Sequence, residues 1–195
     1  MNEIALILNR KIGIIDIIPN IIKHLPTPLT ATPTKYELYS LLNHYDNDFL
    51  FEYYAKRQNI NALKFILQNQ PKFPRNYINH FFISSAENNL LDFVKLFLEN
   101  NANIHFQEDH ALRYAALRGN NEVVKFLINN GANIHEWEEC ALFWSISNND
   151  EEMVKILLDN GADKNKMRPN FFELKPFIHK NMISILENYG LKQNR

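Results

Sequence analysis

Residues 116–134 read ALRGNNEVVKFLINNGANI, and the same pattern of apolar and polar residues occurs twice more at a spacing of 30 residues. Residues 86–104 read AENNLLDFVKLFLENNANI, and residues 146–164 read ISNNDEEMVKILLDNGADK. A further copy begins at Ala55, and a degenerate copy, MISILENYG, ends at Gly190. Self-similarity at a fixed period predicts a solenoid, in which each unit buries its apolar face against the next unit.

Each unit is predicted to form two short helices joined by tight turns. In one unit the apolar positions fall on one face of each helix, at Leu112, Ala115 and Ala116 and then at Val123, Val124, Leu127 and Ile128. Glycine adopts a positive φ at low cost, and Asn tolerates it best among the other residues. We therefore expect the helix-ending turns to depend on Asn101, Gly119, Gly131, Gly161 and Gly190.

The pattern Leu112-x-x-Ala115-Ala116-x-x-Gly119-Asn120-x-x-Val123-Val124-x-x-Leu127-Ile128-x-x-Gly131-Ala132 resembles the ankyrin repeat. The resemblance covers residues 48–190 and is strongest over residues 80–165. The period of 30 residues is shorter than the ~33 usual in that family, and the Thr-Pro-Leu-His opening is absent. The resemblance implies an all-α, ankyrin-type helix–turn–helix solenoid with short loops. Short-period arrays rich in Asn and Ile also resemble the ankyrin repeat proteins of giant DNA viruses of amoebae.

The repeat period divides the chain into predicted segments. The repeats are expected at residues 48–77, 78–107, 108–137 and 138–167, followed by a C-terminal cap at 168–190 and a frayed tail at 191–195. Residues 1–47 do not fit the repeat and are expected to form an extra N-terminal helical segment. Since a solenoid must close its ends, this segment is interpreted first as a cap over the first repeat.

Composition and charge exclude several classes of protein. The chain has 21 basic and 22 acidic residues, and this balance argues against duplex nucleic acid or an anionic membrane as a partner. Its single cysteine, Cys140, allows no intramolecular disulfide. The N-terminus lacks the order of a signal peptide, and no apolar run could span a bilayer. We expect a monomeric, intracellular protein of the cytoplasm, which would be the host's cytoplasm if the protein is viral.

No residue cluster has the spacing of a catalytic, metal or cofactor site. Cys140 stands at the start of a repeat's first helix and is interpreted as a packed thiol. His105 and His135 occupy the same position in adjacent repeats, too far apart to share one zinc ion. The acidic residues around Glu138 lack the spacing of a calcium loop. We therefore predict no catalysis, no bound metal and no cofactor.

What remains is a surface for a protein partner. Arrays of this kind usually bind through loop tips and the exposed side of the first helices. Aromatic residues and Arg are enriched at binding hot spots. These criteria select Phe106, Arg113, Trp137, Phe143 and Met167. Two alternatives stay open, because the aromatic residues could fold back on the short loops and either Phe143 or Trp144 could lie in the core.

We therefore expect a non-catalytic scaffold that binds a protein partner through its concave face and loop tips. The alternative is an adaptor whose repeats hold a target while residues 1–47 recruit a ubiquitin ligase. Some viral ankyrin proteins carry an F-box for that purpose, but here Leu25-Pro26 follows the Ile-rich stretch, whereas in an F-box it would precede it.

Overall fold

The computed structural model describes residues 47–69, 73–167 and 179–190. The chain divides into two compact units, Met1–Ile66 and Leu67–Arg195, and each is described separately. All regular secondary structure in the described residues is helical. The predicted all-α, helix–turn–helix architecture is therefore confirmed. The predicted segment 1–47, except Asn47, and the predicted tail 191–195 lie outside the described residues.

The first unit contains one described helical pair. Helix α3 spans Asn47–Lys56, and helix α4, Ile60–Asn69, extends three residues beyond the unit boundary at Ile66. The two helices are joined by a tight turn in which Gln58 has a φ of 53°. The side chains buried in this unit are apolar on both helices, namely Leu50, Phe51, Tyr54, Ala62, Leu63, Phe65 and Ile66.

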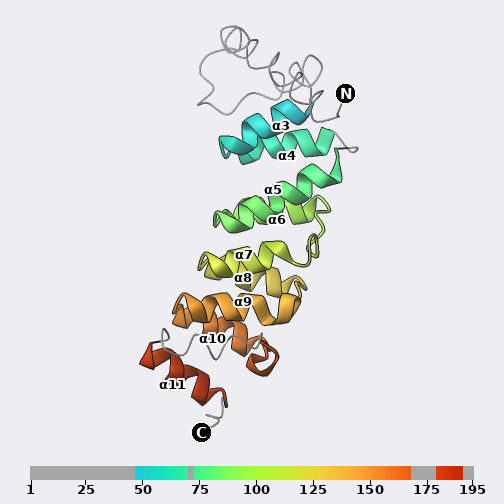
Figure 1. Cartoon of the computed structure of the whole chain (residues 1–195). Coiled ribbons are helices and arrows are strands. Elements are labelled where there is room, and N and C mark those ends of the chain that lie inside the picture. Colours follow the sequence, from blue (N-terminus) through green and yellow to red (C-terminus); the bar gives the residue numbers. More distant parts are fainter. Residues whose placement is uncertain (1–46, 70–72, 168–178, 191–195) are drawn as a thin grey trace, which may run out of the picture. The chain divides into compact units, whose positions relative to one another are not determined.

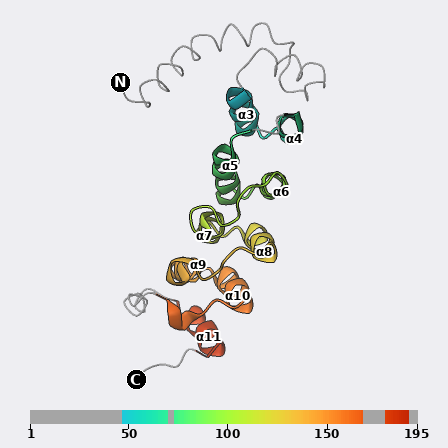
Figure 2. The ribbon, with the colours of Figure 1, turned by 90° about the vertical axis from the view of Figure 1, so that its right-hand side faces the viewer.

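The second unit is a stack of helical pairs (Figure 1). Its elements are α5 (Arg75–Glu87), α6 (Leu91–Glu99), α7 (His110–Leu117), α8 (Asn121–Asn129), α9 (Glu136–Ser147), α10 (Glu151–Asp159), the 3₁₀ helix η1 (Lys164–Lys166) and α11 (Lys180–Asn188). The first helices α5, α7 and α9 follow one another in one column, and α6, α8 and α10 form the second column (Figure 2). The 30-residue period therefore corresponds to one step of this stack.

Small side chains allow the first helices to pack closely. Ala115 and Ala116 of α7 are buried between the neighbouring helices, while Val123, Val124 and Leu127 fill the interior side of α8. Polar side chains also join successive pairs. The buried Asn120 donates from Nδ2 to the carbonyl oxygens of Ala86 and Glu87, at 2.8 and 2.9 Å, and so closes the end of α5.

The turns inside and between pairs use residues with positive φ. The turn after each first helix contains Asn89, Gly119 or Asn149, with φ of 59°, 72° and 54°. The turn after each second helix contains Asn101, Gly131 or Gly161, with φ of 65°, 93° and 97°, and Gly190 follows α11 with a φ of 84°. Asn and Gly thus serve the same backbone geometry in different repeats.

The surroundings of the two glycines in the central repeat predict different tolerance to a side chain. A Cβ at Gly131 would meet no atom within 4 Å, whereas a Cβ at Gly119 would lie 3.0 Å from Oδ2 of Asp150. Asp150 caps α10 by accepting a hydrogen bond from the Met153 amide. We expect Gly131→Ala to cost about 1 kcal/mol from the backbone alone. Gly119→Ala should cost about 2 kcal/mol, because it also displaces the cap.

Urea unfolding of the two variants measures this difference. The matched control is Gly119→Ala combined with Asp150→Ala. If contact with the Asp150 carboxylate causes the extra loss, adding Gly119→Ala to the Asp150→Ala variant should lower the free energy of unfolding by only about 1 kcal/mol. Equal costs for Gly119→Ala and Gly131→Ala in the wild-type chain would show that the Asp150 contact is unimportant.

Candidate interaction surface

The loops that lead into α7 and α9 each contain one left-handed turn. Gln107, Glu108 and Asp109 have φ between 52° and 58°. The equivalent residues one repeat later, Trp137, Glu138 and Glu139, have φ between 53° and 61°, and regular helix begins after them. Left-handed backbone costs roughly 1–2 kcal/mol for each non-glycine residue. Three in succession therefore require interactions that hold the loop in place.

A buried polar side chain at the base of each loop supplies the first of these interactions. Asn79, Asp109 and Glu139 stand 30 residues apart, and each is at most 6% exposed. Oδ1 of Asn79 accepts a hydrogen bond from the Asn103 amide, and Oδ1 of Asp109 accepts one from the Asn133 amide, both at 2.8 Å. The side chain thereby ties the start of a first helix to the loop that ends the same repeat.

Histidines supply the second interaction. Nδ1 of His105 lies 3.1 Å from a carboxylate oxygen of Asp109, and Nδ1 of His135 lies 2.6 Å from Oε1 of Glu139. The backbone amide of each histidine also donates to an Asn side chain two residues before it. These loop histidines therefore hold the left-handed turns, as their interpretation as loop residues expects.

Arg113 supplies the third interaction, and its position corrects the expectation that it is exposed. Only 4% of the residue is accessible. Its Nε donates to the Glu108 carbonyl at 2.9 Å and its Nη2 to the Gln107 carbonyl at 3.0 Å. The guanidinium carbon lies 4.4 Å from the centre of the Trp137 ring, and the Trp137 indole N–H donates to the Glu108 carboxylate. Arg113 thus clamps one loop to the next.

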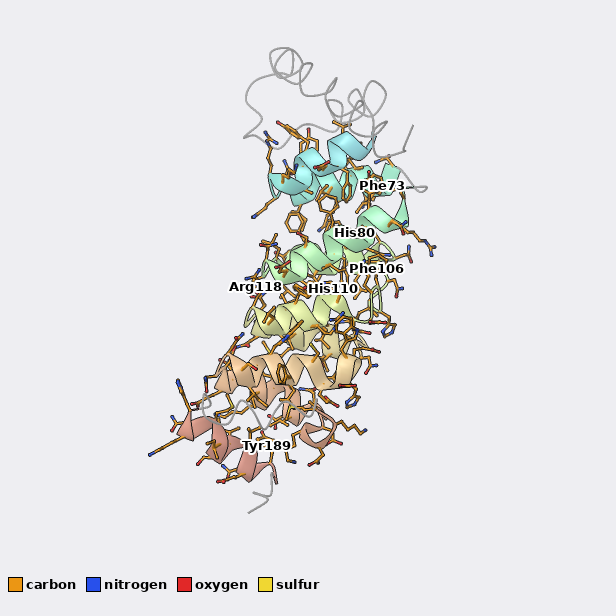
Figure 3. The ribbon with its side chains drawn as sticks, in the orientation of Figure 1. Phe73, His80, Phe106, His110, Arg118 and Tyr189 are labelled. Carbon is orange, nitrogen blue, oxygen red and sulfur yellow. The ribbon has the colours of Figure 1, made fainter. Side chains whose placement is uncertain are left out.

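The other predicted binding residues differ in exposure. Trp137 is 47% exposed, while Phe106 and Phe143 are half-buried. Phe106 packs edge-on against His80 of α5, with ring centres 5.3 Å apart (Figure 3). Met167 is only 8% exposed, contrary to the expectation of a loop tip. It follows the 3₁₀ helix η1 and has a φ of −62°, whereas Gln107 and Trp137 at the same repeat position have a left-handed φ.

The structure also reveals aromatic residues on the first helices that were not selected from the sequence. His110 stacks on Tyr114 within α7, with ring centres 4.1 Å apart. Tyr114 in turn meets Trp144 of α9 edge-on, at 5.8 Å. Both Tyr114 and Trp144 are half-buried, so neither lies wholly in the core. We call Tyr114, Phe143, Trp144 and Trp137 the aromatic face. Its sequence signal is the shared position of Ser84, Tyr114 and Trp144 at 30-residue intervals.

Burial changes the acidity of one residue beside this face. Desolvation lowers the pKa of His110 below its ordinary value, and the positive charge of Arg113 lowers it further. The carboxylate of Glu87 acts in the opposite direction but is the smallest of the three effects. The neutral imidazole is therefore favoured, and the His110–Tyr114 stack presents an uncharged surface.

The described residues include the single cysteine of the chain. Cys140 is buried, as expected for a packed thiol. Among these residues, no group of three or more His, Cys, Asp or Glu side chains is placed to hold a metal ion. No helix in the same part of the chain is both long and apolar enough to cross a membrane.

Residues 80–168 match the family model described as ankyrin repeats (3 copies). This stretch, which includes the whole of α6 to α10, therefore consists of ankyrin repeats. Ankyrin repeats are in general protein–protein interaction modules. No curated protein matches the chain, and its origin in a giant virus of amoebae stays a prediction.

Proposed function

We propose that this protein is a non-catalytic scaffold that holds a protein partner against the aromatic face and the left-handed loops. The aromatic face carries the proposal. Large aromatic side chains lie half-buried or exposed on the first helices. The repeat position of Tyr114 and Trp144 does not require an aromatic residue for folding, because the repeat before Tyr114 has Ser84 there. Partly exposed aromatic side chains at adjoining positions are characteristic of binding hot spots.

The proposal changes the set of predicted binding residues. The side chains of Arg113 and Met167 are buried, so these two residues can affect partner binding only indirectly, by holding the loops in place. Phe106, Trp137 and Phe143 keep a direct role, and Tyr114 and Trp144 join them. The adaptor alternative concerns residues 1–47, almost all of which lie outside the described residues, and no observation favours it over the scaffold.

Replacement of two aromatic residues by the residue that the array itself uses at the same position tests the proposal. A partner would first be captured from the source cell with the wild-type chain and then purified. The variant carrying Tyr114→Ser and Trp144→Ser is expected to bind it at least tenfold more weakly, as loss of hot-spot residues usually does. Calorimetric titration gives the dissociation constants.

The matched control is Phe126→Ser on α8, which removes a half-buried aromatic residue from the second column of helices. It should leave the dissociation constant unchanged within twofold, and thermal unfolding should show that both variants are folded. Binding that withstands the double substitution but is lost with Phe126→Ser would place the partner on the second helices and contradict the proposal.

A further inference from the structure

The loop end of the stack between α7 and α9 carries an excess of negative charge. Five carboxylates occupy the two loops that lead into α7 and α9 against one guanidinium, that of Arg113, with the histidines counted as neutral. They belong to Glu108, Asp109, Glu136, Glu138 and Glu139. This imbalance is local, because the whole chain has a formal net charge of only −1. In the next loop of the stack, η1 packs against α9, but its Lys164 donates to the Tyr189 carbonyl and its Lys166 lies 4.0 Å from Asp163.

The charges are arranged in two layers. Asp109 and Glu139 are buried beneath the loops and hold His105 and His135, whereas Glu108 and Glu138 are exposed at the tips and Glu136 is half-buried. Oε2 of Glu139 is buried and accepts no hydrogen bond from the described part of the chain. The exposed carboxylates at the tips are therefore the ones that a ligand can reach.

The two arginines of α7 are directed to groups other than the exposed carboxylates of these tips. Arg113 is buried beneath Trp137, and its N–H groups are directed to backbone carbonyls. Arg118 stands at the opposite end of α7 and pairs with Glu87 at 2.7 Å (Figure 3). Helix α9 contains three acidic residues in its first turn and no basic residue.

An apolar surface adjoins the acidic tips. Trp137 lies between Glu136 and Glu138 in the chain and is 47% exposed, and the half-buried Phe143 and Trp144 continue along α9. A ligand suited to this arrangement must bring positive charge to the tips and apolar side chains to the helices. The guanidinium of Arg113, 4.4 Å from the Trp137 ring, shows that this site already accommodates a cation.

We propose that the partner segment held by this surface is basic, with Lys or Arg side chains next to apolar ones. The inference rests on the proposed scaffold function and specifies its partner chemistry. The cationic groups meet Glu108 and Glu138 at the loop tips, and the apolar side chains lie on the aromatic face. Charge complementarity of this kind contributes chiefly to partner selection and association rate.

Selection of peptides with the full-length protein tests the inference even while the natural partner is unidentified. A library of random 12-residue peptides displayed on phage would be selected on the immobilised chain. We expect enrichment of Lys and Arg beside Leu, Ile, Val or aromatic residues. The strongest peptide would then be titrated by intrinsic fluorescence, since both tryptophans of the chain, Trp137 and Trp144, lie in α9.

Charge neutralisation at the tips supplies the decisive comparison. The variant with Glu108→Gln and Glu138→Gln keeps the side-chain shapes and is expected to bind the selected peptide about three- to tenfold more weakly. The matched control, Glu122→Gln with Glu152→Gln, removes two exposed carboxylates from α8 and α10 and should change binding by less than twofold. Affinity of the wild-type chain should also fall as salt rises from 50 to 300 mM.

The outcomes separate this inference from the proposed function. Selection of acidic or uncharged peptides, or of none, would overturn the inference, as would equal binding by the tip variant and the control variant. If uncharged apolar peptides are selected and lose binding with Trp144→Ser, the scaffold function stands and the basic partner is wrong. If basic peptides bind but are insensitive to Trp144→Ser, the acidic tips act without the aromatic face.

Discussion

Asp109→Ala is expected to lower the free energy of unfolding by about 2–4 kcal/mol. The side chain of Asp109 is buried, and its Oδ1 accepts the Asn133 amide at 2.8 Å. Alanine removes this acceptor and leaves the donor of a partly buried hydrogen bond without its partner, which costs about 1–3 kcal/mol. Alanine also tolerates the left-handed φ of 52° less well than Asp, which adds roughly 1 kcal/mol. Urea unfolding followed by circular dichroism measures the loss.

Asp109→Asn is the matched control, because the array itself carries Asn79 at this position one repeat earlier. The amide oxygen of Asn79 already accepts the Asn103 amide at 2.8 Å. We therefore expect Asp109→Asn to retain the acceptor and to cost less than 1 kcal/mol. If Asn and Ala at position 109 proved equally destabilising, the negative charge beside His105, and not the acceptor, would be the stabilising element.

The repeat period alone was sufficient to predict most of the fold. Apolar residues at helical spacing and turn residues at fixed offsets placed the helical pairs, and Asn101 has a positive φ like the glycines at its position in later repeats. These features are local, since a turn depends on a few neighbouring residues and an apolar face on the helical period. Such properties follow from the order of residues along the chain and do not depend on the tertiary structure.

The interaction surface was harder to predict, because exposure depends on how the loops fold. Arg is usually exposed, yet Arg113 is buried, as Ile83 is at the same position one repeat earlier. Met167 shares its repeat position with Gln107 and Trp137, which are exposed and have a left-handed φ, but Met167 has a φ of −62° and is buried. The left-handed turns contain no glycine that would indicate a positive φ in the sequence. Tertiary contacts to Arg113 and to the buried carboxylates stabilise these turns instead.

Arg113→Ala should also lower the free energy of unfolding by about 2–3 kcal/mol. The substitution removes two hydrogen bonds to the carbonyls of Gln107 and Glu108, and hydrogen bonds from a charged donor contribute about 1.5–3 kcal/mol each before the carbonyls regain water. It also removes the cation beneath Trp137. Arg113→Lys should recover only part of the loss, because an ammonium group cannot present the two fixed N–H directions of a guanidinium.

Arg118→Ala on the same helix is the control for the loss of an arginine. Its side chain is 59% exposed and pairs with Glu87 at the surface, so its removal should cost at most about 1 kcal/mol. A double-mutant cycle with Trp137→Ala should give a coupling of about 0.5–1 kcal/mol with Arg113 and none with Arg118. Similar costs for the two arginines would mean that the left-handed loop is stable without its clamp. If the clamp is needed, weaker partner binding by Arg113→Ala reports a displaced loop, because the buried guanidinium cannot reach a partner.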